Sequence, residues 1–518
     1  MKSSSSNTNR LGYVVTGLLL GILMAAMDNT IVATAMGTIV ADLGGLDKFV
    51  WVTSAYMVAE MAGMPIFGKL SDMYGRKRFF IFGLILFLLG SILCGTAQTI
   101  VQLSIYRAIQ GIGGGALVPI AFTIVFDVFP PEKRGKMSGM FGAVFGLSSI
   151  FGPLLGAYIT DYINWHWVFY VNIPLGLLAL LLVTLFYKES LQHVRQKIDW
   201  WGAATLVGAI VCLMFGLELG GKQYAWDSAE MLGLLGGFIA LFALFLYIET
   251  KAKEPIISFA MFRSRLFAMS NVVGLFYGAA FIVATVYIPI YVQGVMGGSA
   301  TGSGLILLPM MLGSVVTAQL GGFLAGSGKL SYRDVMLIFS VVFIAGVALL
   351  ATLTPETPRY LLTLYMVLVG LGTGASFSVL GMAVMHKFEA AQRGSANSTM
   401  AFLRSLGMTV GITVFGIIQR NEFASYLAGT LGAQAGQTGI SLEDPRALLS
   451  PETRSAIAPQ LLQPIAQGLS SSIAQTFLWA LLPAVLTLVF ICCMSRERMV
   501  LAPGGEQAKL GARQPSAR

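Results

Sequence analysis

The sequence predicts an all-α polytopic membrane protein, and its composition is the first observation behind that prediction. Of the 518 residues, 56% are hydrophobic and only 11% are charged, whereas a soluble domain carries about 25% charged residues. The mean hydropathy is +0.77. This balance excludes a soluble multidomain enzyme, a disordered scaffold and a secreted disulfide-rich protein.

Long apolar runs are the second observation. A helix needs roughly 20 mostly apolar residues to cross about 30 Å of hydrocarbon. The sequence lacks the alternating pattern of a transmembrane barrel, so backbone groups in the membrane must be satisfied within helices. Fourteen runs are long enough to be predicted as spans. They are 11–33, 49–69, 79–98, 101–127, 136–160, 165–187, 200–220, 229–249, 267–293, 303–325, 335–354, 360–385, 395–419 and 474–495.

The first run is predicted to be a true spanning helix. Residues 1–10 form a short polar leader, expected in the cytoplasm, and the apolar run 11–33 follows it. That run is too long for the hydrophobic core of a signal peptide and lacks a convincing small-residue cleavage site. We therefore expect it to stay in the mature protein.

Basic residues gather on one side of the predicted spans. An even number of spans puts both termini on the same side, and that side holds 25 of the 33 Lys and Arg residues. The positive-inside rule then places both termini, including the tail 496–518, in the cytoplasm. The long tract 420–473 is expected on the extracytoplasmic side. The formal charge of +9 thus reflects orientation in a membrane, and no nucleic-acid partner is expected.

An internal repeat relates two halves of the chain. Residues 106–135 align without gaps to 365–394, an offset of 259. The two equivalent runs cross the membrane in the same direction, as in parallel repeats, and eight spans separate them, so two spans are extra. We therefore predict a six-helix bundle over 11–190, two inserted helices within 191–255 and a second six-helix bundle over 256–495. The matched pairs are Tyr106/Tyr365, Gly111/Gly370, Gly113/Gly372, Gly115/Gly374, Ala116/Ala375, Val125/Val384, Phe129/Phe388, Arg134/Arg393 and Gly135/Gly394.

Charged side chains inside the apolar runs are the candidate functional residues. A charge near the bilayer centre costs at least ~2.5 kcal/mol, so each one is a functional hypothesis. Asp28 and Arg107 lie at similar depths in the first and fourth runs. A helix movement that changes their separation would load and release a proton; the alternative is a static structural ion pair. Met366 replaces Arg107 in the second half, which limits this machinery to the first half.

Glu60 is a second candidate for proton or substrate binding. It lies near mid-membrane in the second run, which also contains Tyr56 and Trp51. A carboxylate beside aromatic rings suits a lipophilic cation, and a proton that competes for the same carboxylate would give antiport. The alternative is a neutral glutamic acid with a packing role. Arg404, also at mid-depth, either lines the substrate cavity or pairs with a structural partner.

Five motifs give the chain a family resemblance. The loop after the second run reads GKLSDMYGRKR (68–78), in which the glycines permit a tight turn and the basic residues anchor the cytoplasmic side. It resembles the most specific signature of the major facilitator superfamily. The other four motifs are similar to those of its fourteen-helix drug:proton antiporters. They are MDNTIV (27–32), RAIQGIGG (107–114), SSIFGPLLG (148–156) and WHWVFYVNIPLG (165–176).

This resemblance covers nearly the whole chain and implies a function. It is closest to the multidrug resistance exporters of Bacillus and related Gram-positive bacteria. It implies a proton-coupled multidrug efflux transporter in the bacterial cytoplasmic membrane, in which two six-helix bundles rock and inward-moving protons drive hydrophobic, often cationic, drugs outward. We expect a monomer in the lipid bilayer, with no cofactor. Gly37 and His166 depart from the family pattern, which has proline and arginine there.

The resemblance also implies gating residues. The expected cytoplasmic gate consists of Gly68, Asp72, Gly75, Arg76 and Arg134. In the fifth run, the pair Gly152–Pro153 removes a helical hydrogen bond and allows a neighbouring helix to approach closely. In exporters of this type the pair is implied to seal the cytoplasm-facing state; the alternative is a helix bend of no special role.

Two other functions stay open. One is a dedicated exporter of a single metabolite, lipid or siderophore. The other is a membrane-embedded enzyme or sensor that has kept a transporter fold, since fold does not fix function. No catalytic constellation supports an enzyme, because the three histidines are not at metal-ligand spacing and there is no nucleophile elbow. The four cysteines lie in apolar runs without paired spacing, so neither disulfides nor a zinc site is expected.

Overall fold

The structure is almost entirely helical. It is a computed structural model that describes residues 2–44, 50–189, 198–221, 223–298, 300–431 and 459–499. Thirteen helices within these residues are long and apolar enough to cross a membrane, and α2 (Val50–Tyr74) occupies the second predicted span. The prediction of an all-α polytopic membrane protein is thereby confirmed.

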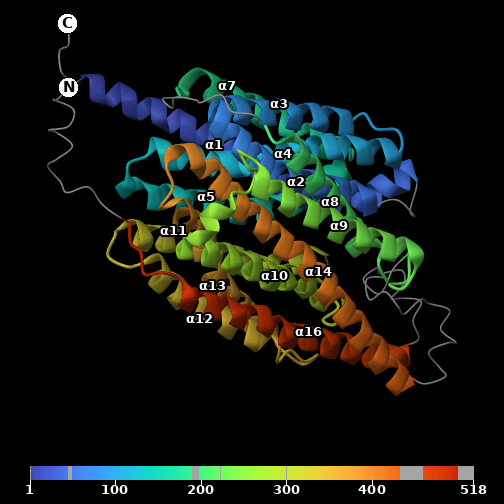
Figure 1. Ribbon diagram of the computed structural model, residues 1–518. Coiled ribbons are helices and arrows are strands. Elements are labelled where there is room, and N and C mark those ends of the chain that lie inside the picture. Colours follow the sequence, from blue (N-terminus) through green and yellow to red (C-terminus); the bar gives the residue numbers. More distant parts are fainter. Residues whose placement is uncertain are drawn as a thin grey trace, which may run out of the picture.

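The helices form two lobes, drawn one above the other in Figure 1. The upper lobe contains α1 (Lys2–Leu43), α2, α3 (Arg76–Cys94), α4 (Ile100–Val128), α5 (Pro131–Tyr162), α6 (Trp167–Tyr170) and α7 (Asn172–Phe186). The lower lobe contains α10 (Arg265–Gly294), α11 (Ala300–Gly326), α12 (Tyr332–Leu350), α13 (Arg359–Met385), α14 (Arg393–Leu431) and α16 (Pro459–Cys493). The connecting helices are α8 (Trp200–Leu219), α9 (Ala229–Lys251), η1 (Phe259–Arg263) and η2 (Ala390–Gln392).

The two ends of the described chain lie at the same end of the molecule. α1 starts and α16 finishes on the left of Figure 1. We call this end, with Lys2 and Cys493, the terminal face, and the opposite end the distal face. These two names give every helix a direction without assuming which side of a membrane each face occupies.

Glycines bring the central helix of the upper lobe into direct contact with its neighbours. At Gly111 and Gly115 of α4, a methyl group would overlap the carbonyl groups of Tyr56 and Glu60 in α2. At Gly113 it would overlap the backbone of α3. Small residues at this spacing let helix backbones approach closely in a membrane, where packing replaces the hydrophobic effect as the driving force.

The lower lobe repeats this arrangement. A methyl group at Gly370 or Gly374 of α13 would overlap the carbonyl groups of Met310 and Ser314 in α11, and one at Gly372 would overlap α12. α13 therefore packs between α11 and α12 as α4 packs between α2 and α3. The repeat seen in the sequence thus corresponds to the same three-helix packing in both lobes.

Several helix ends differ from the predicted span ends. α1 begins at Lys2 and continues to Leu43, so the polar leader forms its first turns and Asp28 lies well inside the helix. α14 extends to Leu431 and α16 begins at Pro459, both within the predicted tract 420–473. Hydropathy marks only the part of a helix in hydrocarbon, whereas backbone hydrogen bonds continue the helix into the interface. Residues 432–458 lie outside the described residues.

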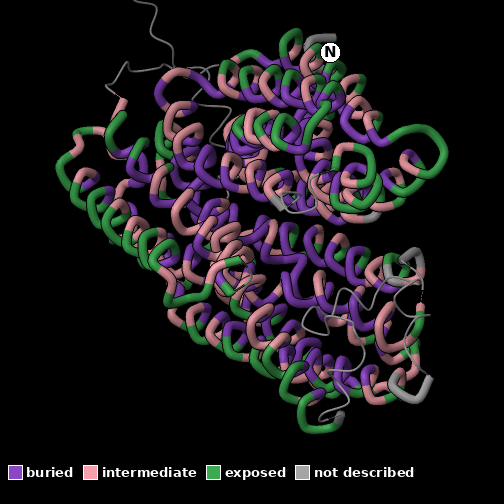
Figure 2. The backbone as a smooth tube through the Cα atoms, turned by 90° about the vertical axis from the view of Figure 1, so that its right-hand side faces the viewer, coloured by how far each residue is buried: buried purple, intermediate pink, exposed green. Residues whose placement is uncertain are grey.

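The two lobes meet mainly on the side of the terminal face. α5 packs against α11 through successive glycines, from Gly135 beside Gly322 to Gly146 beside Met311. These contacts cover the half of α5 nearest the terminal face. Figure 2 views the molecule from the distal face, with the backbone coloured by burial. The lobes are therefore arranged as a structure closed at the terminal face.

Candidate functional site

A cluster of polar side chains is enclosed in the upper lobe. It consists of Asp28 from α1, Ser91 from α3, Arg107 and Gln110 from α4, and Asn172 from α7, and all five are 0% exposed. Water cannot satisfy groups buried to this extent, so they must bond to one another. The cluster is possible because these four helices converge at one point within the lobe.

Asp28 is the centre of the cluster. Its Oδ2 pairs with Nη1 of Arg107. Its Oδ1 accepts hydrogen bonds from Nε2 of Gln110 at 2.8 Å and Nδ2 of Asn172 at 3.1 Å. Gln110 Oε1 accepts a further bond from Arg107 at 2.7 Å. The two residues that the sequence placed at similar depth are thus in contact, and amide donors complete the shell around the carboxylate.

Sequence reasoning missed two members that had a detectable signal. Gln110 comes three residues after Arg107, a spacing that places both side chains on one helix face. Asn172 is an amide in an otherwise apolar run, where polar groups in a membrane are expensive and mark function. Ser91, whose Oγ lies 3.0 Å from both amide nitrogens, carries no such signal because a serine is readily tolerated in any helix.

Tyr56 and Trp51, the aromatic residues expected beside Glu60, each have a well-defined packing partner. Tyr56 is fully buried, and its ring lies 4.1 Å under the guanidinium of Arg107. Trp51 packs against Phe215 of α8, with ring centroids 4.6 Å apart. Tyr56 therefore supports the buried ion pair, and Trp51 contacts α8.

Glu60 lies beside the enclosed cluster but is only half-buried. Its side chain faces Gly114 of α4. It is one turn along α2 from Tyr56, whose ring lies against the guanidinium of Arg107. The upper lobe thus holds two carboxylates, one fully enclosed in an ion pair and one with part of its surface accessible.

Arg404 lies in α14 of the lower lobe. Its Nη2 donates a hydrogen bond to the carbonyl of Ser376 at 2.9 Å, and its guanidinium lies 4.8 Å from the ring of Phe377. Phe377 in turn stacks on Phe145 of α5, at 5.8 Å between centroids. The half-buried Arg404 is therefore next to the point where the two lobes meet.

Asp72 connects the lobes at the terminal face by capping a helix of the opposite lobe. Its carboxylate accepts hydrogen bonds from the backbone N–H groups of Gly394 at 2.9 Å and Ser395 at 2.7 Å. These groups are at the start of α14, where backbone donors have no partners within the helix and the helix dipole favours a negative charge. Asp72 therefore stabilises contact between α2 and α14.

Arginines extend this connection into an ion-pair network. The buried Arg76 binds Asp72, Asp127 and the carbonyl of Ala390. Arg393 of the lower lobe binds Asp127 of the upper lobe at 2.7 Å. Asp72 and Arg76 were predicted from the 68–78 motif, whereas Asp127 and Arg393 were not predicted. Arg393 could have been predicted from the internal repeat, because it aligns with the expected gate residue Arg134.

Arg134 occupies a different place from its repeat partner. Its Nε donates to the carbonyl of Phe129 at 3.0 Å, and its guanidinium lies 4.1 Å from the ring of Phe126. Both contacts are inside the upper lobe. Arg393 makes the matching bond to Phe388 at 3.1 Å and in addition reaches Asp127 across the lobes.

Two glycines of the 68–78 motif have distinct structural reasons. Gly75 has φ of +117°, a backbone conformation that side chains rarely adopt, and it makes the turn from α2 into α3. A methyl group at Gly68 would overlap Ser398 and the carbonyl of Gly394. Gly68 is thus required for the contact between α2 and α14.

The Gly152–Pro153 pair lies at the contact between α5 and α1. A methyl group at Gly152 would overlap the hydroxyl of Thr30, and one at Gly156, a turn later, would overlap that of Thr34. The hydroxyl of Thr30 also lies 3.4 Å from the carbonyl of Ser148. The motif therefore holds α5 tightly against the helix that carries Asp28.

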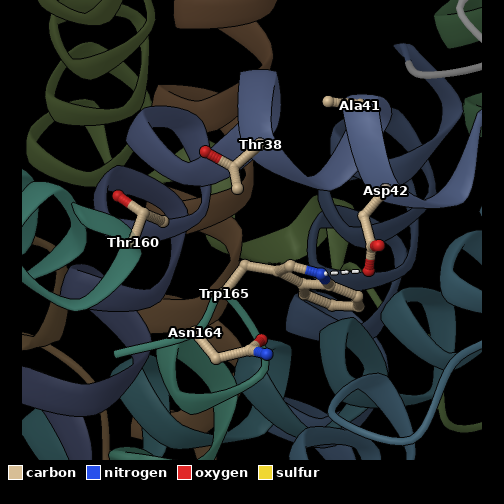
Figure 3. Close-up of a pocket in the computed structure, with 6 residues that line it drawn as sticks. All are labelled: Thr38, Ala41, Asp42, Thr160, Asn164 and Trp165. Carbon is tan, nitrogen blue, oxygen red and sulfur yellow. Dashed lines mark hydrogen bonds between the residues drawn. The ribbon is translucent and has the colours of Figure 1, made fainter. Parts of the chain in front are cut away.

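A separate pocket of about 370 Å³ opens near the distal face. It is lined by Thr38, Ala41, Asp42, Thr160, Asn164 and Trp165. Figure 3 shows the indole of Trp165 pointing to Asp42, whose Oδ2 accepts its hydrogen bond at 2.8 Å. Asp42 is fourteen residues from Asp28 along α1, roughly 20 Å, so this pocket is distinct from the polar cluster.

Comparison with known families agrees with this architecture. The family model described as Major Facilitator Superfamily matches residues 18–412, which is most of the chain. The chain belongs to the Major Facilitator Superfamily. As a member of this superfamily it is a multi-pass membrane transporter of small molecules in a lipid bilayer, and the predicted family resemblance is confirmed.

Curated relatives within the Major Facilitator Superfamily carry transport names. "Multidrug resistance protein 3" of Bacillus subtilis (strain 168) is 57% identical over 96% of this chain and 98% of its own length. "Multidrug transporter protein MdtP" of the same organism is 35% identical, over 91% of this chain and 88% of its own. "Efflux pump dotC" of Dothistroma septosporum is 31% identical, over 87% and 80% respectively.

Solved structures of the superfamily share the fold. The proton:xylose symporter XylE aligns with a TM-score of 0.60 at 15% identity, over 94% of this chain and 96% of its own. The human organic anion transporter MFSD10 aligns with a TM-score of 0.57 at 15% identity, over 91% and 99%. At this identity the likeness establishes the major facilitator fold.

Proposed function

We propose that this transporter is a proton-coupled multidrug efflux protein that exports hydrophobic, often cationic, compounds by alternating access. The names of the relatives support multidrug export, and the relative at 57% identity spans almost the whole chain. The observation that carries proton coupling is the fully buried Asp28–Arg107 pair. Enclosing a carboxylate at this depth costs free energy, and packing alone would not require a charged residue there.

Orientation follows from the distribution of basic residues. The terminal face is the side with most Lys and Arg residues, so it faces the cytoplasm of a bacterial cell under the positive-inside rule. The closed contacts of Asp72, Arg76 and Arg393 then form a cytoplasmic gate. This arrangement corresponds to an outward-facing state, in which bound drug is released and a proton is taken up.

The coupling step requires the Asp28 carboxylate to change partners. While Arg107 neutralises its charge, the carboxylate is stable without a proton. If α1 or α4 moves and separates the pair, an unpaired carboxylate in the lobe is unfavourable, and binding a proton removes the charge. α5 packs tightly on α1 at Gly152 and forms the gate contacts with α11, so it links the gate movement to Asp28.

Glu60 is the place where drug and proton compete. Its half-buried carboxylate is close to the Asp28–Arg107 pair and lies on a helix that contacts the opposite lobe at Met64 and Ser405. A cationic drug and a proton each neutralise this carboxylate, and only one does so at a time. Such exclusion is sufficient for antiport.

The two lobes act as the moving bodies. We assign 11–190 and 256–495 as two six-helix bundles and 191–255 as the inserted pair, in a monomer. Alternating access then consists of rocking one bundle against the other around the central residues.

The test uses everted membrane vesicles that contain the full chain. A lipophilic cationic dye such as ethidium should accumulate under an imposed proton gradient, and an uncoupler should abolish the accumulation. Asp28→Asn should reduce gradient-driven accumulation to background. The control is the double variant Asp28→Asn/Arg107→Met, which removes both charges and should fold while remaining uncoupled. Normal gradient-driven efflux by folded Asp28→Asn protein would remove Asp28 from the mechanism. Dyes that neither move nor compete with one another would favour a single-substrate exporter.

A further inference from the structure

The internal repeat places a histidine where the upper lobe has a gate carboxylate. With its offset of 259, the repeat alignment pairs Asp127 with His386. Asp127 is bound by Arg393 of the opposite lobe at 2.7 Å and by Arg76 of its own lobe. An aspartate is ordinarily charged at neutral pH, whereas a histidine changes its charge close to neutral pH. The lower lobe therefore carries a readily titratable group at the position that holds a carboxylate in the upper lobe.

A second motif carries the same kind of replacement. The tetrapeptide GKLS occurs at 68–71 and again at 328–331. The first copy is followed by Asp72, which caps α14, and the second copy is followed by Tyr332. Tyr332 is fully buried, and its hydroxyl lies 3.1 Å from Nδ1 of His386. Two carboxylates of the upper-lobe gate thus correspond to a tyrosine and a histidine that contact each other in the lower lobe.

The chain that follows α16 packs over this tyrosine–histidine pair. The carbonyl of Glu497 accepts a hydrogen bond from the backbone N–H of Tyr332 at 3.0 Å. Its carboxylate lies 3.9 Å from Nε2 of His386 and is bound by Nζ of Lys387 at 2.8 Å. The hydroxyl of Ser495 donates a further bond to this carboxylate at 2.6 Å. His386 is therefore held between α12, the end of α13 and the segment that follows α16.

The pair also lies next to the upper lobe. At Gly135 of α5, an added methyl group would lie 3.1 Å from Cα of Gly326, the last residue of α11. A short turn then leads from α11 to Tyr332 at the start of α12. Arg134 directly precedes Gly135, and its positive charge acts on His386. A change in the charge of His386 is therefore a change at the contact between the two lobes.

The surroundings of His386, which lies beyond the last residue of α13, favour its neutral form. Burial lowers the pKa of His386 below its ordinary value of 6.5. The carboxylate of Glu497 opposes this shift of the pKa, whereas the positive charges of Lys387 and Arg134 add to it. In the neutral ring, a hydrogen on Nε2 faces Glu497, and the lone pair of Nδ1 accepts the hydroxyl hydrogen of Tyr332. A second proton on the ring removes that acceptor and adds a positive charge beside two others.

We propose that His386 is a proton-binding site on the cytoplasmic side of the gate, and that its protonation by an acidified cytoplasm loosens the contact between α5 and the lower lobe. The inference goes beyond the proposed function, because this proton does not cross the membrane through Asp28. It rests only on the proposed orientation of the terminal face. The closed arrangement holds the neutral ring, so this contribution to closure is complete above pH 6.5. It is lost as the pH falls through the lowered pKa of His386.

Distances between the lobes test this proposal in the purified full chain, without any substrate. Spin labels are attached through Arg78→Cys in the upper lobe and Lys329→Cys in the lower lobe, two exposed positions at the terminal face, in an otherwise cysteine-free protein. Double electron–electron resonance in lipid nanodiscs then gives the fraction of molecules with the longer distance at each pH. This fraction should rise several-fold as the pH falls below 6.5. His386→Gln should remove most of that rise.

Matched variants separate the role of His386 from damage to the fold. Glu497→Gln removes the neighbouring negative charge and should move the midpoint of the transition about one pH unit lower. Tyr332→Phe removes the donor to Nδ1 and should move the midpoint higher, because the neutral ring loses its hydrogen bond. His166→Gln changes a histidine near the opposite, distal face and should leave the wild-type profile unchanged. A general packing defect would instead move the midpoint in the same direction in the first two variants.

The outcomes also separate this inference from the proposed function. An unchanged pH profile in folded His386→Gln protein overturns the site, and so does a wild-type distance that does not change with pH. Shifts of the midpoint in the same direction in Glu497→Gln and Tyr332→Phe overturn it as well. Wild-type protein with the His386-dependent profile that exports no dye under a proton gradient supports the site and overturns only the proposed function.

Discussion

The two halves of the molecule share their packing but differ in their charges. α4 and α13 each press three glycines against two neighbouring helices. Where α4 carries the buried Arg107, however, α13 carries the fully buried Met366. The residues whose carbonyl groups lie against these glycines also differ in charge. Glu60 lies against Gly115, whereas the neutral Ser314 lies against Gly374. Close helix packing is thus common to both repeats, whereas among the described residues a fully buried ion pair of this kind, Asp28–Arg107, lies in the upper lobe alone.

Arg107→Met gives the upper lobe the residue of the lower lobe and should have the largest effect. It leaves the Asp28 charge buried without its partner, which costs about 3–5 kcal/mol. We expect strongly reduced stability in detergent, measured by thermal unfolding, together with loss of proton-driven efflux. The double variant Asp28→Asn/Arg107→Met should recover most of the stability and none of the coupling. Equal stability of single and double variants would show that the two side chains are not energetically coupled.

The proposed gate offers a second comparison, between two arginines in equivalent positions of the repeat. Arg134 and Arg393 make the same bond to a backbone carbonyl, and only Arg393 binds Asp127 across the lobes. Arg393→Gln should therefore weaken the closed gate, whereas Arg134→Gln should change it little. A cysteine placed at Asn397 in a cysteine-free protein reports this, because Asn397 is buried between the lobes and bonds to the carbonyl of Pro119. Its alkylation from the cytoplasmic side should be several-fold faster in Arg393→Gln.

The cysteine variant alone is the reference for that comparison. Equal alkylation rates in the two arginine variants would mean that the cross-lobe ion pair contributes nothing to closure. Many ion pairs near a protein surface contribute no measurable stability.

Glycine packing should show the smallest difference between the halves. Gly111→Ala and Gly370→Ala both force a methyl group onto a neighbouring backbone carbonyl, which costs about 1–3 kcal/mol when a packed core is overfilled. We expect similar losses of thermal stability in the two variants. Gly233→Ala in α9 is the control, since nothing lies within 4 Å of its added methyl group. A large loss in only one half would indicate that the repeats do not pack equivalently.

The sequence predicted the helices and the repeat because hydropathy and glycine spacing are local. Asp28 and Arg107 were identifiable for a related reason, since a charge in an apolar run stands out regardless of its partner. Partners that come from distant segments of the sequence were harder to predict. Asn172 and Ser91 join the cluster only because α7 and α3 converge on α1 and α4, and no local pattern records that convergence.

The direction in which each side chain points was also not predictable from the sequence. Trp51 and Tyr56 are on the same helix as Glu60, but one contacts α8 and the other lies under Arg107. Which face of an apolar helix meets lipid, a neighbouring helix or the central space depends on three-dimensional packing, because all three surroundings accept the same aromatic residues. Helix ends were misplaced for a different reason, since a helix continues beyond the hydrocarbon that hydropathy detects.

The inserted helix α8 has a consequence for how the lobes move. Leu206, Ile210 and Met214 of α8 share an apolar cluster with Met61 of α2 and Phe402 of α14, so one helix touches both bundles. Any rocking motion must shear one of these two surfaces. In the proposed rocking mechanism, the packing of α8 against both bundles therefore adds to the energetic cost of switching between states.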